Sequence, residues 1–370
     1  MNTITDELLK EEVYALPLSL KKPLFLKAMK ESLLIHQSHC APYRSFLESY
    51  SFDPCRMERI EDIPPLSVSV FKELDLFSVH REEISSIIHS SATTSGKPSV
   101  IFLDALTTRR QQNALRAIME SFIGIERLPF IVFDDATIIK RGGADTPSRS
   151  SAVRGFLSFA KSLTCVLNQN LTFDVEHFES ALYALPEGSR VSFFGFTWVL
   201  YRVWEDLKMH PALKARVRKA LLHLGPGSML LHLGGWKKLT DINIDKKMFN
   251  QRMSEFLGIA PENCMDIYGM TEQLGTIYPD CSAGHKHAPA YADILIRDIS
   301  TLESLPTGCE GFIELLSPLP HSYPGVALIS DDLGELCGED DCPCGRKGKY
   351  FTFTRRSNIA PLKGCGDTLL

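Results

Sequence analysis

The chain has 370 residues, of which 44% are hydrophobic and 23% are charged, and its formal net charge is −5. This composition predicts a globular protein with a large core, and the charge excludes a strongly basic nucleic-acid-binding protein. No apolar run reaches the roughly 20 residues that span a bilayer, and the start of the chain lacks a secretory signal, so we expect a cytoplasmic protein.

The first part of the chain is expected to be helical. Between residues 5 and 50, apolar side chains recur at helical spacing, for example at Leu26, Met29 and Leu33. The helical stretch should end near Pro42, because proline disfavours a helical conformation in the residue before it. A proline-rich connection follows at 60–75 and marks a candidate domain boundary.

From about residue 85, short strands and helices are expected to alternate. Strands are predicted at 100–102, 129–133, 190–194, 228–233 and 265–268. Helices are predicted at 107–122, 196–206, 211–222 and 244–257. Thr107 is the expected cap of the first of these helices. After residue 288 the pattern changes to short strands and turns.

This order of elements predicts an α/β fold with a largely parallel sheet and a smaller β subdomain. We therefore expect four segments along the chain. These are a helical segment at 1–75, an α/β core at 76–287, a β subdomain at 288–350 and a tail at 351–370.

Four short motifs carry residue types that suit a nucleotide. The loop SSATTSGKPS at 90–99 combines hydroxyls, a glycine and a lysine that suit phosphates, although it is not a Walker A loop. The glycines of LGGWKK at 233–238 follow a strand and would let a ligand approach the backbone. In YGMTE at 268–272, the tyrosine offers a face for a purine and the glutamate a carboxylate for Mg²⁺. In SDD at 330–332, a carboxylate could hold a ribose diol, but each motif is also typical of an ordinary turn.

Taken in order, the four motifs resemble those of the adenylate-forming superfamily of acyl and aryl ligases, and RRS at 355–357 resembles its hinge motif. HLGGWKK, the segment at 286–317, ISDDLGEL and the tail RRSNIAPLKGC are similar to one branch of it. That branch is the acyl-protein synthetases of bacterial bioluminescence, which act as long-chain-fatty-acid–luciferin-component ligases. YGMTE and CPCGR also resemble phenylacetate–CoA ligases, and Thr93 stands where the superfamily has glycine.

The resemblance implies an adenylate-forming ligase core and roles for individual residues. The residues implied in ATP binding are Ser91, Thr93, Thr94, Ser95, Gly96, Gly234, Gly235, Trp236, Tyr268, Gly269, Asp332 and Arg356. The residues implied at the phosphates and Mg²⁺ are Lys97, Thr271 and Glu272. The expected acyl pocket comprises Phe193, Phe194, Gly195, Phe196 and Trp198, although aromatic residues after a strand are more often part of the core.

The tail carries the expected acyl acceptor. Superfamily ligases that use coenzyme A continue into a mobile C-terminal domain with a catalytic lysine, whereas this sequence stops at Leu370, so we expect no such domain. The resemblance implies that Cys365 accepts the acyl group, and nearby Lys363 would favour its thiolate form. The alternative is an unreactive cysteine in a terminal segment.

Cysteines and histidines cluster in the β-rich region. The segments DCSAGHKH and CPCG bring candidate ligands for a structural Zn²⁺, which needs four nitrogen or sulfur ligands. The expected ligands are Cys281, His287, Cys342 and Cys344, with His285 or Cys337 as possible replacements. The alternative is a set of solvent-facing cysteines in turns.

The sequence therefore predicts an enzyme that uses ATP and Mg²⁺ to convert a carboxylic acid, by the resemblance a fatty acid, into an acyl-adenylate. The acyl group would pass to Cys365 and then to a partner protein such as a fatty acid reductase. Two alternatives are left open. The enzyme could donate the acyl group to coenzyme A or a carrier protein, or the chain could be a non-catalytic nucleotide-binding subunit of a reductase complex.

Overall fold

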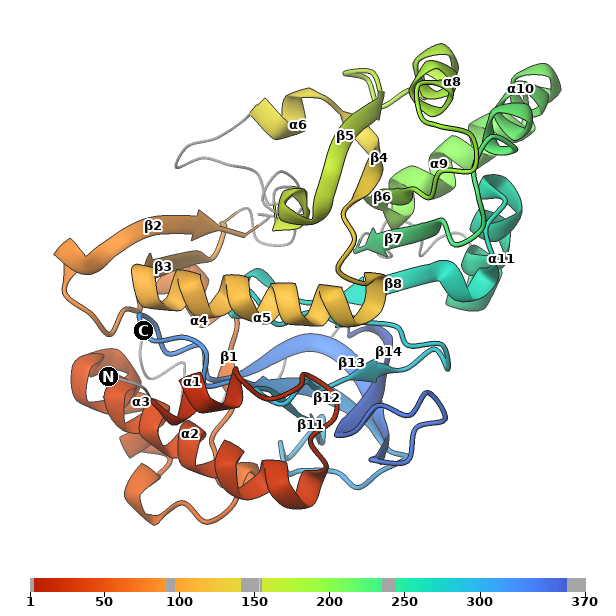
Figure 1. The fold of residues 1–370 in the computed structure, drawn as a ribbon. Helices are drawn as coiled ribbons and strands as arrows, with labels where there is room; N and C mark the ends of the chain where they lie inside the picture. Colours follow the sequence, from red (N-terminus) through yellow and green to blue (C-terminus); the bar gives the residue numbers. More distant parts are fainter. Residues whose placement is uncertain (1–2, 91–96, 141–152, 154, 235–243, 358–370) are drawn as a thin grey trace. The chain divides into compact units, whose positions relative to one another are not determined.

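The structure is a computed structural model that describes residues 3–90, 97–140, 153, 155–234 and 244–357. The described residues form two compact units (Figure 1). The continuous unit is Ile125–Tyr268, and the split unit combines Met1–Gly124 with Gly269–Leu370. The four-segment division expected from the sequence stays a prediction.

The continuous unit contains a parallel sheet with the strand order β5-β4-β6-β7-β8. Its strands are β4 (Leu128–Asp135), β5 (Ala160–Leu167), β6 (Ser192–Phe196), β7 (Met229–Leu233) and β8 (Cys264–Tyr268). Its helices are α6 (Thr137–Lys140), α8 (Val175–Tyr183), α9 (Thr197–Lys208), α10 (Pro211–Leu221) and α11 (Lys246–Leu257). The predicted parallel α/β arrangement is confirmed, although the sequence did not predict β5 and α8.

Local sequence explains these elements. Three successive residues of β4, Ile131, Val132 and Phe133, are all buried, which is typical of strands in a parallel sheet that is covered on both faces. Helix α11 begins after Asp245, whose carboxylate accepts a hydrogen bond from a main-chain N–H of the first turn. It ends at Gly258, whose φ of 66° lies in the left-handed region that glycine adopts without strain.

The split unit contains an antiparallel sheet with the strand order β10-β14-β13-β12-β11. These strands are β10 (Lys286–His287), β11 (Asp293–Arg297), β12 (Glu310–Leu316), β13 (Ala327–Glu339) and β14 (Lys349–Arg356). The other strands of the unit are β1 (Leu66–Ser67), β2 (Ile84–His89), β3 (Val100–Asp104) and β9 (Tyr278–Pro279). Strand β1 pairs with β13 in parallel, and β2 pairs with β3. The strands predicted after residue 288 are confirmed.

Helices from the first third of the chain belong to the same unit. They are α1 (Ile4–Leu8), α2 (Leu18–His39), α3 (Ala41–Ser49), α4 (Val70–Glu73) and α5 (Ala105–Ile123). On α2, Phe25, Met29 and Leu33 recur at helical spacing and share one hydrophobic core with Leu295 and Leu316 of the sheet. None of the helices in the described part of the chain combines the length and apolarity needed to cross a membrane.

The first long helix ends close to the expected position near Pro42, but the expected cause is wrong. The break falls at Cys40, which has extended backbone angles and separates α2 from α3. Pro42 lies in the first turn of α3, where a missing N–H costs no hydrogen bond. The proline therefore starts a helix instead of ending one.

A buried group of charges joins α2 to the sheet. The Asp293 carboxylate lies 3.9 Å from Lys21 Nζ and 3.1 Å from Lys349 Nζ. Burial raises the pKa of Asp293, but the two ammonium groups outweigh burial and hold that pKa below its ordinary value. Two cations around one carboxylate therefore fix the contact between α2, β11 and β14.

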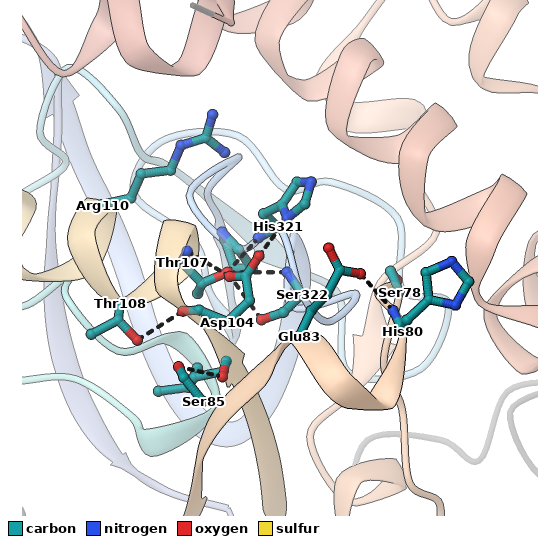
Figure 2. Close-up of polar contacts among 12 residues, drawn as sticks. Ser78, His80, Glu83, Ser85, Asp104, Thr107, Thr108, Arg110, His321 and Ser322 are labelled. Carbon is teal, nitrogen blue, oxygen red and sulfur yellow. Dashed lines mark hydrogen bonds and ion pairs between the residues drawn. The ribbon is translucent and has the colours of Figure 1, made fainter. Parts of the chain in front are cut away.

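The N-cap of helix α5 is Asp104, so the prediction that Thr107 caps the helix is wrong. One carboxylate oxygen of Asp104 accepts a hydrogen bond from Thr107 N at 2.7 Å, and the other lies 2.8 Å from His321 Nδ1. The Thr107 hydroxyl accepts hydrogen bonds from the main-chain N–H groups of His321 and Ser322, at 3.0 Å each. Figure 2 shows that the cluster ties the end of β3 and the start of α5 to the segment around His321.

We predict that Asp104→Ala destabilises the protein by about 1–2 kcal/mol at pH 7, because α5 loses its cap. Burial raises the pKa of Asp104, but hydrogen bonds from His321 and Thr107 outweigh it and lower that pKa to about 2. A lowered carboxyl pKa gives stability that is present above the unfolded pKa of about 3.9 and is lost as the pH falls toward the folded value. Urea unfolding should therefore show a smaller difference between variant and wild type at pH 3 than at pH 7. Exposed Asp75→Ala is the control, and a difference in stability that does not depend on pH would contradict the lowered pKa of Asp104.

Candidate active site

The YGMTE segment ends in a tight turn that buries its glutamate. Thr271–Gln273 is one turn of 3₁₀ helix. Glu272 is only 8% exposed, and its carboxylate forms no ion pair with a residue that the structure describes. A buried carboxylate without a cation is costly, so this side chain suits a bound metal ion.

The main chain around Glu272 is held by neighbouring side chains. The Tyr323 hydroxyl donates a hydrogen bond to the Glu272 carbonyl at 3.0 Å and accepts one from Gln111 Nε2 at 3.3 Å. Gln273 Nε2 donates to the carbonyl oxygens of Leu315 and Gly325, at 3.2 Å each. Sequence reasoning missed Tyr323 and Gln273, because no local pattern connects either residue to the segments that it binds.

Strands β13 and β14 bring Asp332 and Arg356 together. The two residues are directly opposite in the strand register, and Arg356 Nε donates to Asp332 Oδ1 at 3.1 Å. The strands bulge near Gly334, where an added Cβ would lie 2.3 Å from the Thr352 carbonyl oxygen. Glycine is therefore required next to the pair, because only a residue without a side chain lets the strands approach.

The phosphate-loop residues Ser91, Thr93, Thr94, Ser95 and Gly96 lie outside the described part of the chain. The hairpin of β2 and β3 leads into the loop, and Ser90 and Ser99 are hydrogen-bonded to each other at its base. Lys97 is half exposed, and its Nζ lies 3.0 Å from Glu73 Oε2. An exposed ion pair is weak, so Lys97 could exchange Glu73 for a phosphate at little cost.

In the continuous unit, Gly234 and Tyr268 lie at the ends of two neighbouring parallel strands. Gly234 comes directly after β7 with a φ of 53°, and Tyr268 is the last residue of β8. Because β7 and β8 pair in parallel, both residues lie at the carboxyl edge of the sheet, where open α/β sheets bind ligands. Gly235 and Trp236 lie outside the described residues.

The expected acyl-pocket residues are mostly packed against the core of the continuous unit. Phe193 lies 6.2 Å from Phe133 between ring centroids, and Phe194 lies 4.9 Å from the ring of Phe156. A Cβ at Gly195 would lie 3.0 Å from the side chain of Leu200. Phe196 and Trp198 are half-buried beside the same core. A role for these five residues in an acyl pocket stays a prediction.

The four expected metal ligands converge in the split unit. Ligand atoms of Cys281, His287, Cys342 and Cys344 all lie within 4.8 Å of one another. The two Sγ atoms of Cys281 and Cys342 are 3.9 Å apart, and Cys344 Sγ lies 3.3 Å from His287 Nε2. Bond lengths of about 2.0–2.3 Å in a tetrahedral zinc site place ligand atoms about 3.5–3.8 Å apart, so the spacing suits zinc.

Two turns and one strand pair set this cluster. Pro343 and Gly345 shape the Cys342–Gly345 turn, which is closed by a hydrogen bond from Gly345 N to the Cys342 carbonyl at 2.9 Å. A second turn closes at Cys281, whose N–H donates to the His285 carbonyl at 2.8 Å. His287 pairs with Tyr350 at the start of β14. His285 Nδ1 lies 3.4 Å from Cys342 Sγ and is a neighbour of the cluster.

The electrostatics of the cluster also suit a cation. Burial raises the pKa of Cys342 to about 12, and burial lowers the pKa of His287 to about 4. A neutral imidazole is the form that binds a metal, whereas the Cys342 thiol needs a positive charge nearby to ionise. A divalent cation at this position would supply that charge.

The fold defines the class of this protein. A crystal structure of 2-hydroxyisobutyryl-CoA ligase in the postadenylation state matches with a TM-score of 0.69 and 16% identity, over 93% of this chain and 69% of that chain. An open conformation of that ligase, in complex with 2-HIB-AMP and CoA, matches with a TM-score of 0.68 over 76% of its chain. The chain therefore has the fold of an adenylate-forming ligase.

Sequence comparison identifies the family. The family described as "Acyl-protein synthetase, LuxE" matches residues 1–370. The long-chain-fatty-acid–luciferin-component ligase of Vibrio harveyi is 25% identical over 353 residues, which is 93% of this chain and 87% of that protein. The Aliivibrio fischeri protein of the same name is 22% identical over 92% of this chain and 86% of its own. The chain belongs to the LuxE acyl-protein synthetase family, so it is an enzyme of the acyl-adenylate-forming type, and the resemblance read from its motifs is confirmed.

Cys365 lies outside the residues that the structure describes, as does the whole segment 358–370. The expected alternative ligand Cys337 is half-buried on β13, and its Sγ lies near the Glu335 carbonyl oxygen and the Thr352 hydroxyl. The group of possible metal ligands found among the described residues does not include Cys337.

We predict that Gln273→Ala lowers the free energy of unfolding by about 1–3 kcal/mol, because two buried carbonyl groups lose their donor. Gln273 is 1% exposed and both of its acceptors are main-chain atoms, so no other side chain can easily replace it. Urea unfolding measures the change, with exposed Gln112→Ala as the control. Equal stability of the two variants would show that the amide does not hold the Glu272 turn.

Proposed function

We propose that this enzyme activates a long-chain fatty acid with ATP, loads the acyl group onto its own Cys365 and then delivers it to a partner protein. The observation that carries the proposal is the match of the acyl-protein synthetase family to residues 1–370, with relatives named as long-chain fatty acid ligases. The buried Glu272 and the Asp332–Arg356 pair support the nucleotide roles that the motifs imply.

In the first step, a carboxylate oxygen of the acid attacks the α-phosphorus of ATP. A P–O bond forms, the bond to the bridging oxygen breaks, and pyrophosphate leaves with the electron pair. Lys97 and Thr271 are proposed to donate hydrogen bonds to phosphate oxygens, while the Asp332 carboxylate accepts hydrogen bonds from the ribose hydroxyls. Mg²⁺ held near Glu272 would offset negative charge on the phosphates when it is bound.

Adenine and ribose are proposed to contact three further residues. The Tyr268 ring offers an aromatic face to the purine at the carboxyl end of β8. Gly234 lets the base approach the backbone, because no side chain projects there. Arg356, already hydrogen-bonded to Asp332, would orient that carboxylate while donating to the ribose or phosphate.

In the second step, the Cys365 thiolate attacks the carbonyl carbon of the acyl-adenylate. A C–S bond forms, the bond between the carbonyl carbon and the phosphate oxygen breaks, and AMP leaves. The proton of the thiol passes to solvent. A nucleophile of the partner protein then attacks the thioester and regenerates the cysteine, for which the sequence suggests a fatty acid reductase.

We also propose that Cys281, His287, Cys342 and Cys344 hold a structural zinc ion. All four positions of a tetrahedral ion would be filled by protein, so the ion would stabilise the fold and take no part in the reaction. The convergence of the four ligand atoms supports this role.

We also propose a cytoplasmic location, which fits the nine described cysteines, because none of them forms a disulfide bond.

For activation, we predict that Glu272→Gln slows acid-dependent ATP–pyrophosphate exchange by about 10²–10³-fold, because one charge directed at the metal ion is lost. Circular dichroism should show an intact fold. Exposed Glu58→Gln is the matched control and should exchange at the wild-type rate. Wild-type exchange by Glu272→Gln would remove this residue from the site.

For transfer, we predict that Cys365→Ser keeps ATP–pyrophosphate exchange but no longer forms a stable acyl-protein, because the serine hydroxyl stays protonated at neutral pH. Mass spectrometry after incubation with ATP and tetradecanoate detects the acyl group. Exposed Cys55→Ser should be acylated like wild type. A hydroxylamine-labile acyl group on Cys365→Ser would place the acceptor elsewhere, and rapid acyl transfer to coenzyme A by this variant would favour the coenzyme A alternative.

For the metal, we predict about one zinc ion per chain and its loss in Cys342→Ser, together with a lower melting temperature, because binding free energy contributes to folding. Elemental analysis and calorimetry measure the two effects on protein purified without chelator. Cys309→Ser, a half-buried cysteine outside the cluster, is the control. If the wild type contains no metal and has the same melting temperature as Cys342→Ser, the zinc site would be contradicted.

A further inference from the structure

A small pocket opens between three helices of the continuous unit, on a surface that the proposed reaction does not use. It has a volume of about 130 Å³ and lies between α9, α10 and α11. Trp204, Leu207, Val217 and Phe256 form its apolar wall. Leu207, Val217 and Phe256 are buried, so the wall belongs to the packed core and is largely preformed.

The rim of the pocket is basic. Three exposed cations line it, namely Lys208, Lys214 and Arg218. The lining includes a single carboxylate, that of Glu255. Lys208 is paired with Glu205 at 3.2 Å. Lys214 and Arg218 form no ion pair with any residue that the structure describes. Two cations therefore remain available to an anionic ligand.

Two cations contact the tryptophan ring of the pocket. Lys208 Nζ lies 4.5 Å from the Trp204 ring centroid, and the Arg252 guanidinium lies 4.8 Å from it. Arg252 also donates a hydrogen bond to the Tyr201 hydroxyl at 3.2 Å. These contacts limit the freedom of the indole, which reduces the entropy lost when a ligand packs against it.

Helix α10 as a whole concentrates positive charge in a chain of net charge −5. Its sequence PALKARVRKAL holds four cations and no anion. Arg216 is neutralised by Glu179 of α8, which it binds through two hydrogen bonds. Met209 and Leu222, which flank α10, are 76% and 84% exposed. Exposed apolar side chains beside unpaired cations are typical of a surface that binds an acidic protein segment.

The size of the pocket decides between possible occupants. A cavity of about 150 Å³ binds benzene, so 130 Å³ admits one aromatic or branched aliphatic side chain. A long-chain acyl group has more than twice as many carbon atoms as benzene and would not fit. The pocket therefore suits a single anchoring side chain and not the fatty acid itself.

We infer that this pocket docks an acidic segment of a partner protein that inserts one large apolar side chain against Trp204 and pairs its carboxylates with Lys214 and Arg218. The inference does not depend on which acid is activated. A single anchor in a preformed pocket with a charged rim is a common arrangement of binding hot spots.

The test uses the full-length protein and a short fluorescein-labelled peptide in which glutamates and aspartates flank one central phenylalanine. Fluorescence anisotropy should show binding that weakens with salt, and the same peptide with alanine at the centre should bind less tightly. Lys214→Glu with Arg218→Glu should reduce affinity by roughly tenfold or more. The control is the double variant Arg202→Glu with Lys219→Glu, which changes the net charge by the same amount at exposed positions that do not line the pocket. It should bind the peptide almost as tightly as the wild type.

The double variant Lys214→Gln with Arg218→Gln is a milder change at the same two positions. Both double variants of the pocket should keep ATP–pyrophosphate exchange. Loss of binding with retained exchange separates this inference from the proposed function. Equal losses in the pocket and control pairs, no preference for phenylalanine, or no binding would each overturn it. Displacement of the peptide by tetradecanoate would assign the pocket to a fatty acid. Self-association of the wild type that Lys214→Glu with Arg218→Glu abolishes would assign it to a second copy of the chain.

Discussion

The pairing of β13 with β14 is the constraint on which two clusters of the split unit depend, the proposed nucleotide-binding pair and the proposed metal site. At one end of the pair, the register places Arg356 opposite Asp332. At the other end, the connection between the strands carries Cys342 and Cys344, and β10 adds His287 beside the start of β14. A shift of one residue would move alternate side chains to the opposite face, so both clusters need the same register. A metal ion bound at one end would therefore help to fix the Asp332–Arg356 pair, proposed to bind the nucleotide, at the other.

Hydrogen bonds also hold the turn that carries Glu272, the acidic residue of the YGMTE segment. Tyr323 donates to the main-chain carbonyl of Glu272. The side chain of the next residue, Gln273, donates to the carbonyl oxygens of Leu315 and Gly325, so the turn that carries the carboxylate is fixed. Catalytic geometry benefits from such support, because a carboxylate that is already oriented loses little freedom when its ligand arrives. The Asp104 and His321 cluster extends this support to the start of α5, because Tyr323 is two residues from His321.

The sequence predicted four of the five parallel strands of the continuous unit, all but β5, because apolar runs such as PFIVF at 129–133 are a local signal. It also predicted the four converging Cys and His residues, since their spacing in two short turns is local. It could not predict that residues 1–124 join residues 269–370 in one unit, because contacts such as Leu66 with Leu328 connect distant segments. Tyr323 as the support of Glu272 was missed for the same reason, because the two residues are far apart in the chain. Asp104 as the cap of α5 was missed although its bond to Thr107 N is local, because Thr107 is also a residue type that caps helices.

Substrate-dependent ATP–pyrophosphate exchange tests the central claim most directly, because it reports acyl-adenylate formation before any acceptor is involved. The panel would contain octanoate, tetradecanoate, hexadecanoate, phenylacetate and 2-hydroxyisobutyrate, without coenzyme A. The account predicts exchange that depends on the long-chain acids and needs no added thiol. Exchange that depends on phenylacetate or 2-hydroxyisobutyrate alone, or no exchange with any acid, would contradict it.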